Sequence, residues 1–337
     1  MGAPGQSMSH YLLLGAGFSR NWGGWLAAEA FEYLLGRPEV IGNQVLRSVL
    51  WKGQARGGFE HALAELQVAT RSGDGNAKQN LDALQAAVTA MFNDMNAGFY
   101  RLSTLNFRNT VDRSVTGFLA NFDAIFTLNQ DLLLEHHYLT NDPSLQSRGK
   151  WSGATMPGVK PTTPLGNGSD LSWANRSFVP LPEDQFGIQD RMQPLFKLHG
   201  SSNWHTDDGN SMLVMGGNKV REIGLSPILS WYQRQFEEFV SQPGARLMVI
   251  GYGFRDEHIN EIIMRAIIHR GLKLFVIAPE GAGIARAANP TGGAAIYART
   301  SLEDALESGL IGASRRGMRE IFGDDEAELA KLRRFFD

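Results

Sequence analysis

The chain has 337 residues, which at roughly 150 residues per domain predicts about two folding units. Its 32 lysines and arginines nearly balance 35 aspartates and glutamates, and the net charge of −3 excludes a nucleic-acid coat or a polyanionic tail. The absence of cysteine excludes disulfides, thiolate-bound zinc or iron–sulfur centres and a cysteine nucleophile. No spanning-length apolar run and no basic-then-apolar leader is found, so we expect a soluble cytoplasmic protein that contacts neither membranes nor nucleic acid directly.

Short, continuously apolar runs predict buried strands at five points of the chain. They lie at residues 11–14, 124–128, 195–198, 247–250 and 274–278. Helical patterns separate several of them, which favours an α/β fold. We therefore predict a Rossmann-like, doubly wound parallel sheet with helices on both faces and a mainly helical insertion.

The predicted organisation is a single catalytic unit over residues 1–337 with two insertions. Its parts are a core from about 8–30, 119–138 and 194–300, a helical insertion over about 31–118, a loop-rich insertion over about 139–193 and a helical tail over about 301–337. The apolar stripe of residues 80–100 is either an ordinary packing face or a subunit interface. A loop as long as the second insertion is usually functional or disordered.

A glycine-rich turn follows the first predicted strand. Residues Gly15–Arg20 read GAGFSR, ahead of a helix expected to begin near Trp25. Glycines let a backbone approach a diphosphate closely, and Ser19 adds a hydroxyl donor. The dehydrogenase fingerprint GxGxxG is not met, because its last glycine is replaced by Arg20 and a helical pattern follows. Simple turn chemistry would also explain these residues.

Polar residues follow three other predicted strands, where α/β sheets normally bind ligands. They are Asn129, Gln130 and Asp131 after the second run, His199, Gly200 and Ser201 after the third, and Gly251–Gly253 and then Asp256 after the fourth. Each has a structural explanation too, since Asn129 could cap the next helix and His199 could be a hydrogen-bonded core histidine. Their recurrence at successive strand ends favours one shared site.

In this order the motifs resemble those of the sirtuins. The matching segments are GAGxS at 15–19, TxNxD at 127–131, LHG at 198–200 and a glycine turn at 251–253. Two longer segments, KLHGSxxW at 197–204 and IGYGxxDxxIN at 250–260, look like those of bacterial sirtuin-like NAD hydrolases of antiphage defence, including the type associated with HerA ATPases. The likeness spans roughly residues 10–280.

Two departures from the sirtuin pattern bear on the reaction. Deacylating sirtuins usually carry a four-cysteine zinc module, and this chain has no cysteine. Their INxE segment near the adenosine is replaced here by Ile277–Glu280. Both departures disfavour protein deacylation and leave nucleotide cleavage less affected.

The resemblance implies NAD as the substrate, with no metal, and cleavage of the nicotinamide–ribose bond to give nicotinamide and ADP-ribose. Nicotinamide is a pyridinium cation before cleavage and leaves as a neutral molecule, so it needs no proton donor. Ordinary glycosidases need a paired acid and base partly because their leaving oxygen must be protonated. A site with one histidine and one amide is therefore adequate for an NAD glycohydrolase.

The resemblance assigns catalysis to Asn129, His199 and Asp131. Asn129 would orient the attacking water or the ribose hydroxyls, and His199 would bind a ribose hydroxyl or act as general base. Asp131 would orient its neighbours or contact the nicotinamide amide. The residues expected to bind the dinucleotide are Gly15, Ala16, Gly17, Phe18, Ser19, Gln130, Gly200, Ser201, Gly251 and Gly253.

Other functions stay open beside this one. An NAD-dependent protein deacylase, an ADP-ribosyltransferase and a non-catalytic NAD-binding assembly subunit are alternatives. A metal hydrolase is disfavoured, because His136 and His137 are adjacent, His199 and His205 are six apart, and no HExxH motif exists.

An NAD hydrolase depletes the NAD of its own cell, which suits abortive infection in antiphage defence and calls for gating. The sequence contains no separate ligand-sensing domain, so we expect control by homo-oligomerisation or by a partner protein, with the helical insertion as the contact surface. The resemblance suggests a HerA-type hexameric ATPase, an Argonaute-like protein or a phage protein as partner, and the sequence does not choose among them.

Overall fold

A seven-stranded sheet lies at the centre of the computed structural model, which describes residues 8–54, 58–139, 150–162, 176–216, 219–288 and 301–337. Its strand order is β11-β10-β9-β1-β2-β6-β3, and all pairings are parallel. The strands are β1 (Ser9–Leu14), β2 (Ala124–Thr127), β3 (Gly153–Thr155), β6 (Met192–Lys197), β9 (Ala245–Ile250), β10 (Lys273–Ile277) and β11 (Leu310–Ser314). The five apolar runs coincide with β1, β2, β6, β9 and β10, which confirms the predicted Rossmann-like α/β fold.

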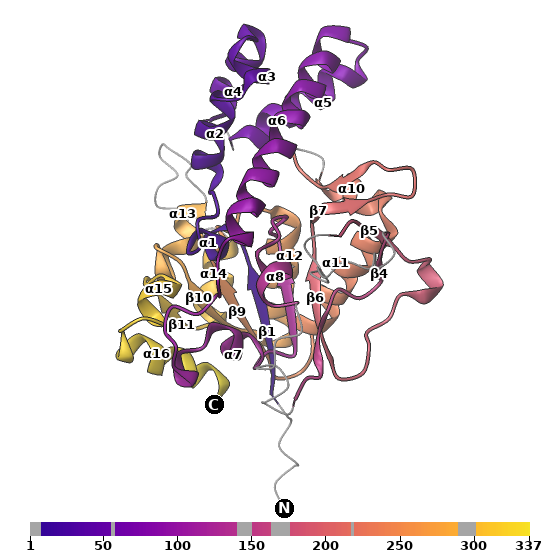
Figure 1. Ribbon diagram of the computed structural model, residues 1–337. Helices are drawn as coiled ribbons and strands as arrows, with labels where there is room; N and C mark the ends of the chain where they lie inside the picture. Colours follow the sequence, from indigo (N-terminus) through magenta and orange to yellow (C-terminus); the bar gives the residue numbers. More distant parts are fainter. Residues whose placement is uncertain (1–7, 55–57, 140–149, 163–175, 217–218, 289–300) are drawn as a thin grey trace, which may run out of the picture.

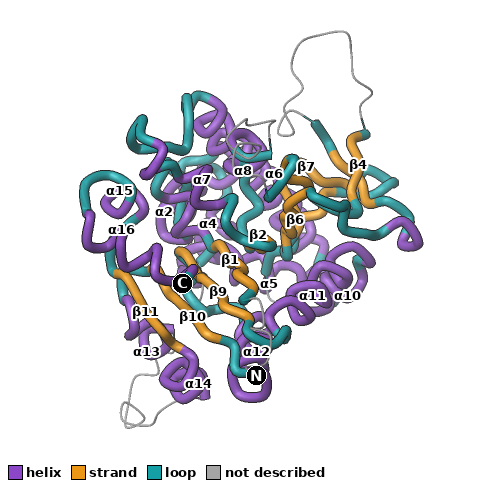
Figure 2. The backbone as a smooth tube through the Cα atoms, turned by 90° about the horizontal axis from the view of Figure 1, so that it is seen from below, coloured by secondary structure: helices purple, strands orange, loops and turns teal. Residues whose placement is uncertain are grey.

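Helices cover both faces of this sheet, as Figure 2 shows. On one face lie α11 (Pro227–Val240), α12 (Glu257–Arg270) and α14 (Ser301–Gly309), and on the other α7 (Val115–Leu119), α8 (Leu133–His137), α15 (Met318–Ile321) and α16 (Glu326–Arg333). Neighbouring strand residues point to opposite faces. Accordingly Tyr11 packs on Phe239, whereas His10 packs on Phe335 near the C-terminus.

The helical insertion projects beyond the carboxyl ends of the strands (Figure 1). It comprises α2 (Ala27–Leu35), α3 (Pro38–Ile41), α4 (Gln44–Gln54), α5 (Phe59–Arg71) and α6 (Gly75–Tyr100). The α6 helix begins at Asp74, whose carboxylate accepts hydrogen bonds from the N–H groups of Asn76 and Ala77. Its predicted apolar stripe is buried and packs on α5 and neighbouring helices.

The glycine turn contains a short helix that the sequence did not predict, α1 (Ala16–Arg20). The helix expected near Trp25 is α2, which begins at Ala27. Asn21 ends α1 and accepts a hydrogen bond from the N–H of Met318, which ties the turn to α15.

A second, smaller sheet stands beside the first, with the order β4-β5-β7-β8. Its strands are β4 (Val159–Pro161), β5 (Phe178–Pro180), β7 (Gly200–His205) and β8 (Ser211–Leu213). The segment predicted to be loop-rich over 139–193 thus contributes β3, β4 and β5, which are too short to show an apolar period. Its stretches 140–149 and 163–175 lie outside the described residues.

The remaining elements of the described residues are short. They are α10 (Lys219–Leu225), α13 (Ile284–Ala288) and the 3-10 turns Val111–Arg113, Glu183–Gln185, Gly281–Gly283 and Arg334–Phe336. The tail that the sequence predicts as helical also contains β11, which pairs with β10 at the edge of the main sheet. Among the described helices, none has the length and apolar character that crossing a bilayer requires.

Backbone-to-backbone contact joins the turns after β1 and β9. The N–H of Gly15 donates to the carbonyl of Ile250 at 3.0 Å, and that of Gly17 to the carbonyl of Gly251 at 2.9 Å. A Cβ atom on Gly17 would lie 2.7 Å from the Cα of Gly251, and one on Gly251 would lie 2.3 Å from the backbone nitrogen of Phe18. Only glycines permit this approach.

Replacing Gly251 by alanine should therefore destabilise the protein more than a positive φ alone explains. Gly244 is a matched control, because both glycines have positive φ, +65° and +74°, but a Cβ on Gly244 meets no atom within 4 Å. We expect Gly244→Ala to cost about 1–2 kcal/mol and Gly251→Ala clearly more, measured by urea unfolding. Equal losses would contradict the close-contact account.

Candidate active site

The predicted site segments meet at the carboxyl ends of the main-sheet strands, because these strands are parallel and in register. Leu14 pairs with Thr127 on one side and with Ile250 on the other, and Thr127 pairs with Lys197. The pairing continues as the N–H of Leu198 donates to the carbonyl of Thr127. Asn129 and His199 therefore lie at matching positions, two residues beyond a paired strand end.

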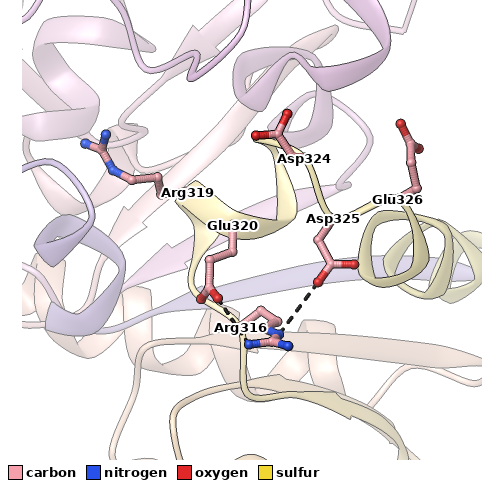
Figure 3. A pocket seen from close by; sticks show the side chains of 6 residues that line it. All are labelled: Arg316, Arg319, Glu320, Asp324, Asp325 and Glu326. Atoms are coloured by element: carbon pink, nitrogen blue, oxygen red, sulfur yellow. Dashed lines mark hydrogen bonds and ion pairs between the residues drawn. The ribbon is translucent and has the colours of Figure 1, made fainter.

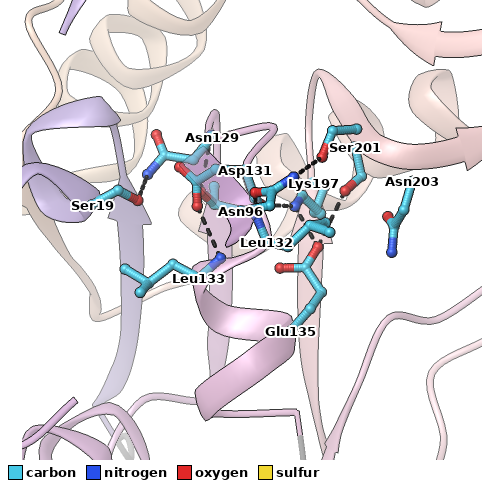
Figure 4. A network of polar contacts seen from close by, with 12 residues as sticks. Ser19, Asn96, Asn129, Asp131, Leu132, Leu133, Glu135, Lys197, Ser201 and Asn203 are labelled. Carbon is cyan, nitrogen blue, oxygen red and sulfur yellow. Dashed lines mark hydrogen bonds and ion pairs between the residues drawn. The ribbon is translucent and has the colours of Figure 1, made fainter. Parts of the chain in front are cut away.

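The side chain of Asn129 is bound to the glycine turn. Its Nδ2 donates to the carbonyl of Gly15 and to Oγ of Ser19, both at 3.0 Å (Figure 4). It does not cap α8, since the N–H of Leu133 is bonded instead by Oδ1 of Asp131 at 3.0 Å. In the described part of the chain, Oδ1 of Asn129 accepts no hydrogen bond, which leaves this oxygen available to a ligand.

Gln130 and Asp131 are buried and hold the backbone around the site. Nε2 of Gln130 donates to the carbonyls of His199 and Val214, at 2.9 and 2.8 Å. Burial raises the pKa of Asp131, although Lys197 acts in the opposite direction. Both side chains thus have a structural role, and their predicted contacts with the nucleotide stay predictions.

His199 lies at the point where the chain passes from the main sheet into the second sheet, between β6 and β7. Gly200 makes this passage possible with a φ of +76°, and a Cβ there would lie 2.0 Å from the carbonyl oxygen of Met212. The His199 side chain is only 3% exposed. Burial lowers its pKa to about 3, although Asp256 opposes the shift, so the imidazole is neutral at neutral pH.

A cluster of charged and polar groups adjoins His199. Its Nε2 lies 3.2 Å from Nε2 of His258, at the start of α12. Asp256 Oδ1 is 2.7 Å from Nζ of Lys219, which also pairs with Glu60 of α5 at 2.8 Å. Burial would raise the pKa of Asp256, but the neighbouring His199 and Lys219 lower it on balance.

Sequence reasoning singled out Asp256 in this cluster and missed His258. A usable signal existed, because Asp256 and His258 are two residues apart directly after the glycine turn of β9. Lys219 and Glu60 carried no such signal, since they come from α10 and α5, far away in the sequence.

The same cluster has the donor atoms of a metal site. His199, Asp256 and His258 each offer one ligand atom, and these atoms lie within 4.8 Å of one another. Asp256, however, is already neutralised by the ammonium group of Lys219, which would repel a divalent cation beside it. His137, one of the histidines weighed in the sequence, lies elsewhere and contacts the carbonyl of Phe99 through Nε2.

A buried ion pair lies beneath the site, between β6 and α8. Lys197 pairs with Glu135 and donates to the carbonyl of Asp131 at 2.6 Å (Figure 4). Ser201 is fully buried and donates to Glu135 at 3.2 Å. Burial raises the pKa of Glu135, against the opposing effect of Lys197. Ser201 therefore belongs to this network, and its position does not support the predicted diphosphate contact.

The other predicted binding residues differ in exposure. Ala16 and Gly253 are exposed at the two turns, whereas Ser19 is buried behind Asn129. Phe18 is fully buried and packs on Trp22 with ring centroids 4.9 Å apart, so only its backbone belongs to the turn.

A pocket elsewhere is formed by the C-terminal elements (Figure 3). It is lined by Arg316, Arg319, Glu320, Asp324, Asp325 and Glu326. Arg316 pairs with Glu320 and Asp325, at 3.3 and 3.6 Å. None of the predicted site residues lines this pocket.

Comparison with known proteins identifies the family. Residues 123–291, half of the chain, match the SIR2-like domain. The chain belongs to the SIR2-like domain family. No match was found among curated proteins. The match contains the strand ends at 129–131, 199–201 and 251–253, and the GAGFS turn precedes it. SIR2-like domains are typically enzymes with NAD-dependent activity, which gives this SIR2-like protein an NAD-related function.

Removing one partner of the buried Lys197–Glu135 pair should destabilise the protein. Lys197→Met would leave the Glu135 carboxylate in the core without its cation, and removing one partner of a buried pair costs about 3–5 kcal/mol. The double variant Lys197→Met/Glu135→Leu should lose less, because no unpaired charge remains. The exposed pair Lys78–Asp82 is the control, and Lys78→Met should change the free energy of unfolding by at most about 1 kcal/mol. A double variant less stable than Lys197→Met would contradict this account.

Proposed function

We propose that this SIR2-like protein is an NAD glycohydrolase, which converts NAD and water into nicotinamide, ADP-ribose and a proton. One observation carries the proposal: Asn129 and His199 follow adjacent parallel strands at matching positions, and Asn129 is hydrogen-bonded to the Gly15 turn. An amide and an imidazole at these strand ends suffice for a reaction whose leaving group departs neutral. The absence of cysteine, and with it of a four-cysteine zinc module, favours cleavage over deacylation.

Asn129 and His199 would have different roles in the reaction. Because Nδ2 of Asn129 is committed to Gly15 and Ser19, its Oδ1 would accept a hydrogen bond from the attacking water or a ribose hydroxyl. The neutral imidazole of His199 would take a proton as the water attacks C1′. Positive charge develops on the ribose as nicotinamide leaves, so a rigid grip on the sugar supplies much of the rate.

The diphosphate would lie over the GAGFS turn. Gly15 and Gly17 use their N–H groups to bond the β9 end, so they shape the turn and do not donate to the ligand. The exposed Ala16, at the start of α1, would face the ligand from the β1 side. The exposed Gly253 would face the same ligand from the β9 side.

Incubation of the full-length protein with NAD, followed by chromatography of nicotinamide and ADP-ribose, tests the proposal. Asn129→Ala and His199→Ala should each lower the rate by about 10²-fold or more. The controls Asn210→Ala and His205→Ala change the same residue types in or beside the second sheet and should keep parent activity.

The same assay distinguishes the alternatives. Product that appears only with an added acyl-lysine peptide or a protein acceptor would indicate deacylation or ADP-ribosyl transfer. NAD that binds and stays intact would indicate a binding subunit. Parent-level nicotinamide release by both site variants would contradict the assignment of Asn129 and His199.

We further propose that the activity depletes cellular NAD in antiphage abortive infection and is gated by assembly. The helical insertion supports this, because it projects from the sheet (Figure 1). It also carries exposed apolar side chains. They include Ile41, Val45 and Trp51 on α3 and α4. Homo-oligomers, or complexes with a HerA-type ATPase, an Argonaute-like protein or a phage protein, would use this surface.

Light scattering together with NAD turnover tests the gating. We expect a larger assembly whenever the protein is active, and we expect Trp51→Glu to shift both towards the monomer and the inactive state. The exposed Ile311 of β11, outside the helical insertion, provides a control, and Ile311→Glu should change neither. A monomer with constitutive activity would rule the gating out.

A further inference from the structure

His199 and His258 share a contact that the proposed mechanism does not use. Their Nε2 atoms lie 3.2 Å apart, their ring centroids 5.4 Å apart, and the rings are tilted by 39°. Their exposed fractions are 3% and 9%. Within the described residues this is the one side-chain hydrogen bond of His199, so His258 alone restrains the orientation of that ring by a polar contact.

A hydrogen bond between two neutral imidazoles links their tautomers. It needs one N–H and one lone pair at the two Nε2 atoms, because two N–H groups would clash and two lone pairs would leave buried acceptors unpaired. Burial lowers the pKa of both histidines, so both rings are neutral. The tautomer of His258 thus sets that of His199, and Nδ1 is the nitrogen of His199 left for a substrate.

Charged groups adjoin the pair, and among them Asp256 raises the pKa of both rings, against the larger opposing effect of burial. Asp256 lies two residues before His258, and Lys219 ties its carboxylate to Glu60 on α5. These two carboxylates and one ammonium carry a net charge of −1, which one proton on the histidine pair would neutralise. The same Lys219 makes the cluster a poor metal site, so a hydrogen bond explains the contact of the rings better than a shared ion.

We propose that His258 is a positioning residue that fixes the tautomer and the orientation of His199 through the Nε2–Nε2 hydrogen bond. The inference rests on the proposed function of His199. As water attacks C1′, its proton goes to Nδ1 of His199, the new C–O bond forms, and nicotinamide leaves with the electrons of the broken C–N bond. A proton on Nε2 of His199 can then pass to Nε2 of His258, beside Asp256.

Two substitutions of His258 test the hydrogen bond and leave the volume similar. Glutamine can donate or accept near the Nε2 position, whereas leucine can do neither. We expect His258→Leu to lower kcat about 10- to 100-fold, the effect typical of losing a partner that orients a histidine, with KM for NAD nearly unchanged. His258→Gln should restore most of kcat. His269→Leu and His269→Gln, at an exposed position of the same helix, are the controls.

A second measurement does not depend on turnover. Nitrogen NMR of ¹⁵N-histidine-labelled protein reports which ring nitrogen carries the proton. We expect a single His199 tautomer in the parent and a mixture in His258→Leu. This readout keeps the inference testable if the parent releases no nicotinamide, a result that would count against the proposed function alone.

Three results would overturn the inference. One is an active parent whose kcat survives His258→Leu. Another is an unchanged His199 tautomer in that variant. The third is activity that is lost with a chelator and restored by Zn²⁺, since a metal ion would then join the two rings.

Discussion

The contact of Gly251 with Gly15 and Gly17 is the constraint on which the site depends. Backbone lies directly on backbone there, and no side chain fits between the two turns. This contact fixes α1 against the end of β9, and Asn129 then bonds both Gly15 and Ser19. Because β1, β2 and β6 are paired in register, the position of His199 is fixed relative to Asn129 and Gly15. The geometry of the site thus follows from the contacts that join the carboxyl ends of β9, β1, β2 and β6.

Most polar side chains at the carboxyl ends of these strands are bound to backbone groups or to one another. Gln130 fixes the carbonyls of His199 and Val214, and the buried Lys197–Glu135 pair holds β6 against α8. Buried polar groups of this kind need all their hydrogen-bond partners, and a fully bonded network makes this end of the sheet rigid. In the part of the chain that the structure describes, Oδ1 of Asn129 and Nδ1 of His199 have no hydrogen-bond partner, and the proposed cleavage of NAD needs these two atoms.

The sequence predicted the parts of the fold that have a clear period. Continuous apolar runs such as Leu12–Leu14 predicted five of the seven main strands. The polar residues after these runs predicted that the site lies at the carboxyl ends of the strands. The three-residue strands β3, β4 and β5 were missed, because so short a segment shows no alternation. Lys219 was missed for another reason: its importance arises from contacts with Asp256 and Glu60 that only the folded chain creates. His258 was missed although it follows Asp256 by two residues.

A structure of the His199→Ala variant bound to NAD would test the central claim most directly. The account predicts the nicotinamide ribose within hydrogen-bond distance of Oδ1 of Asn129, its C1′ beside the space left by the imidazole, and the diphosphate over Ala16. A dinucleotide bound away from Asn129 and position 199, with its ribose at another edge of the sheet, would contradict it.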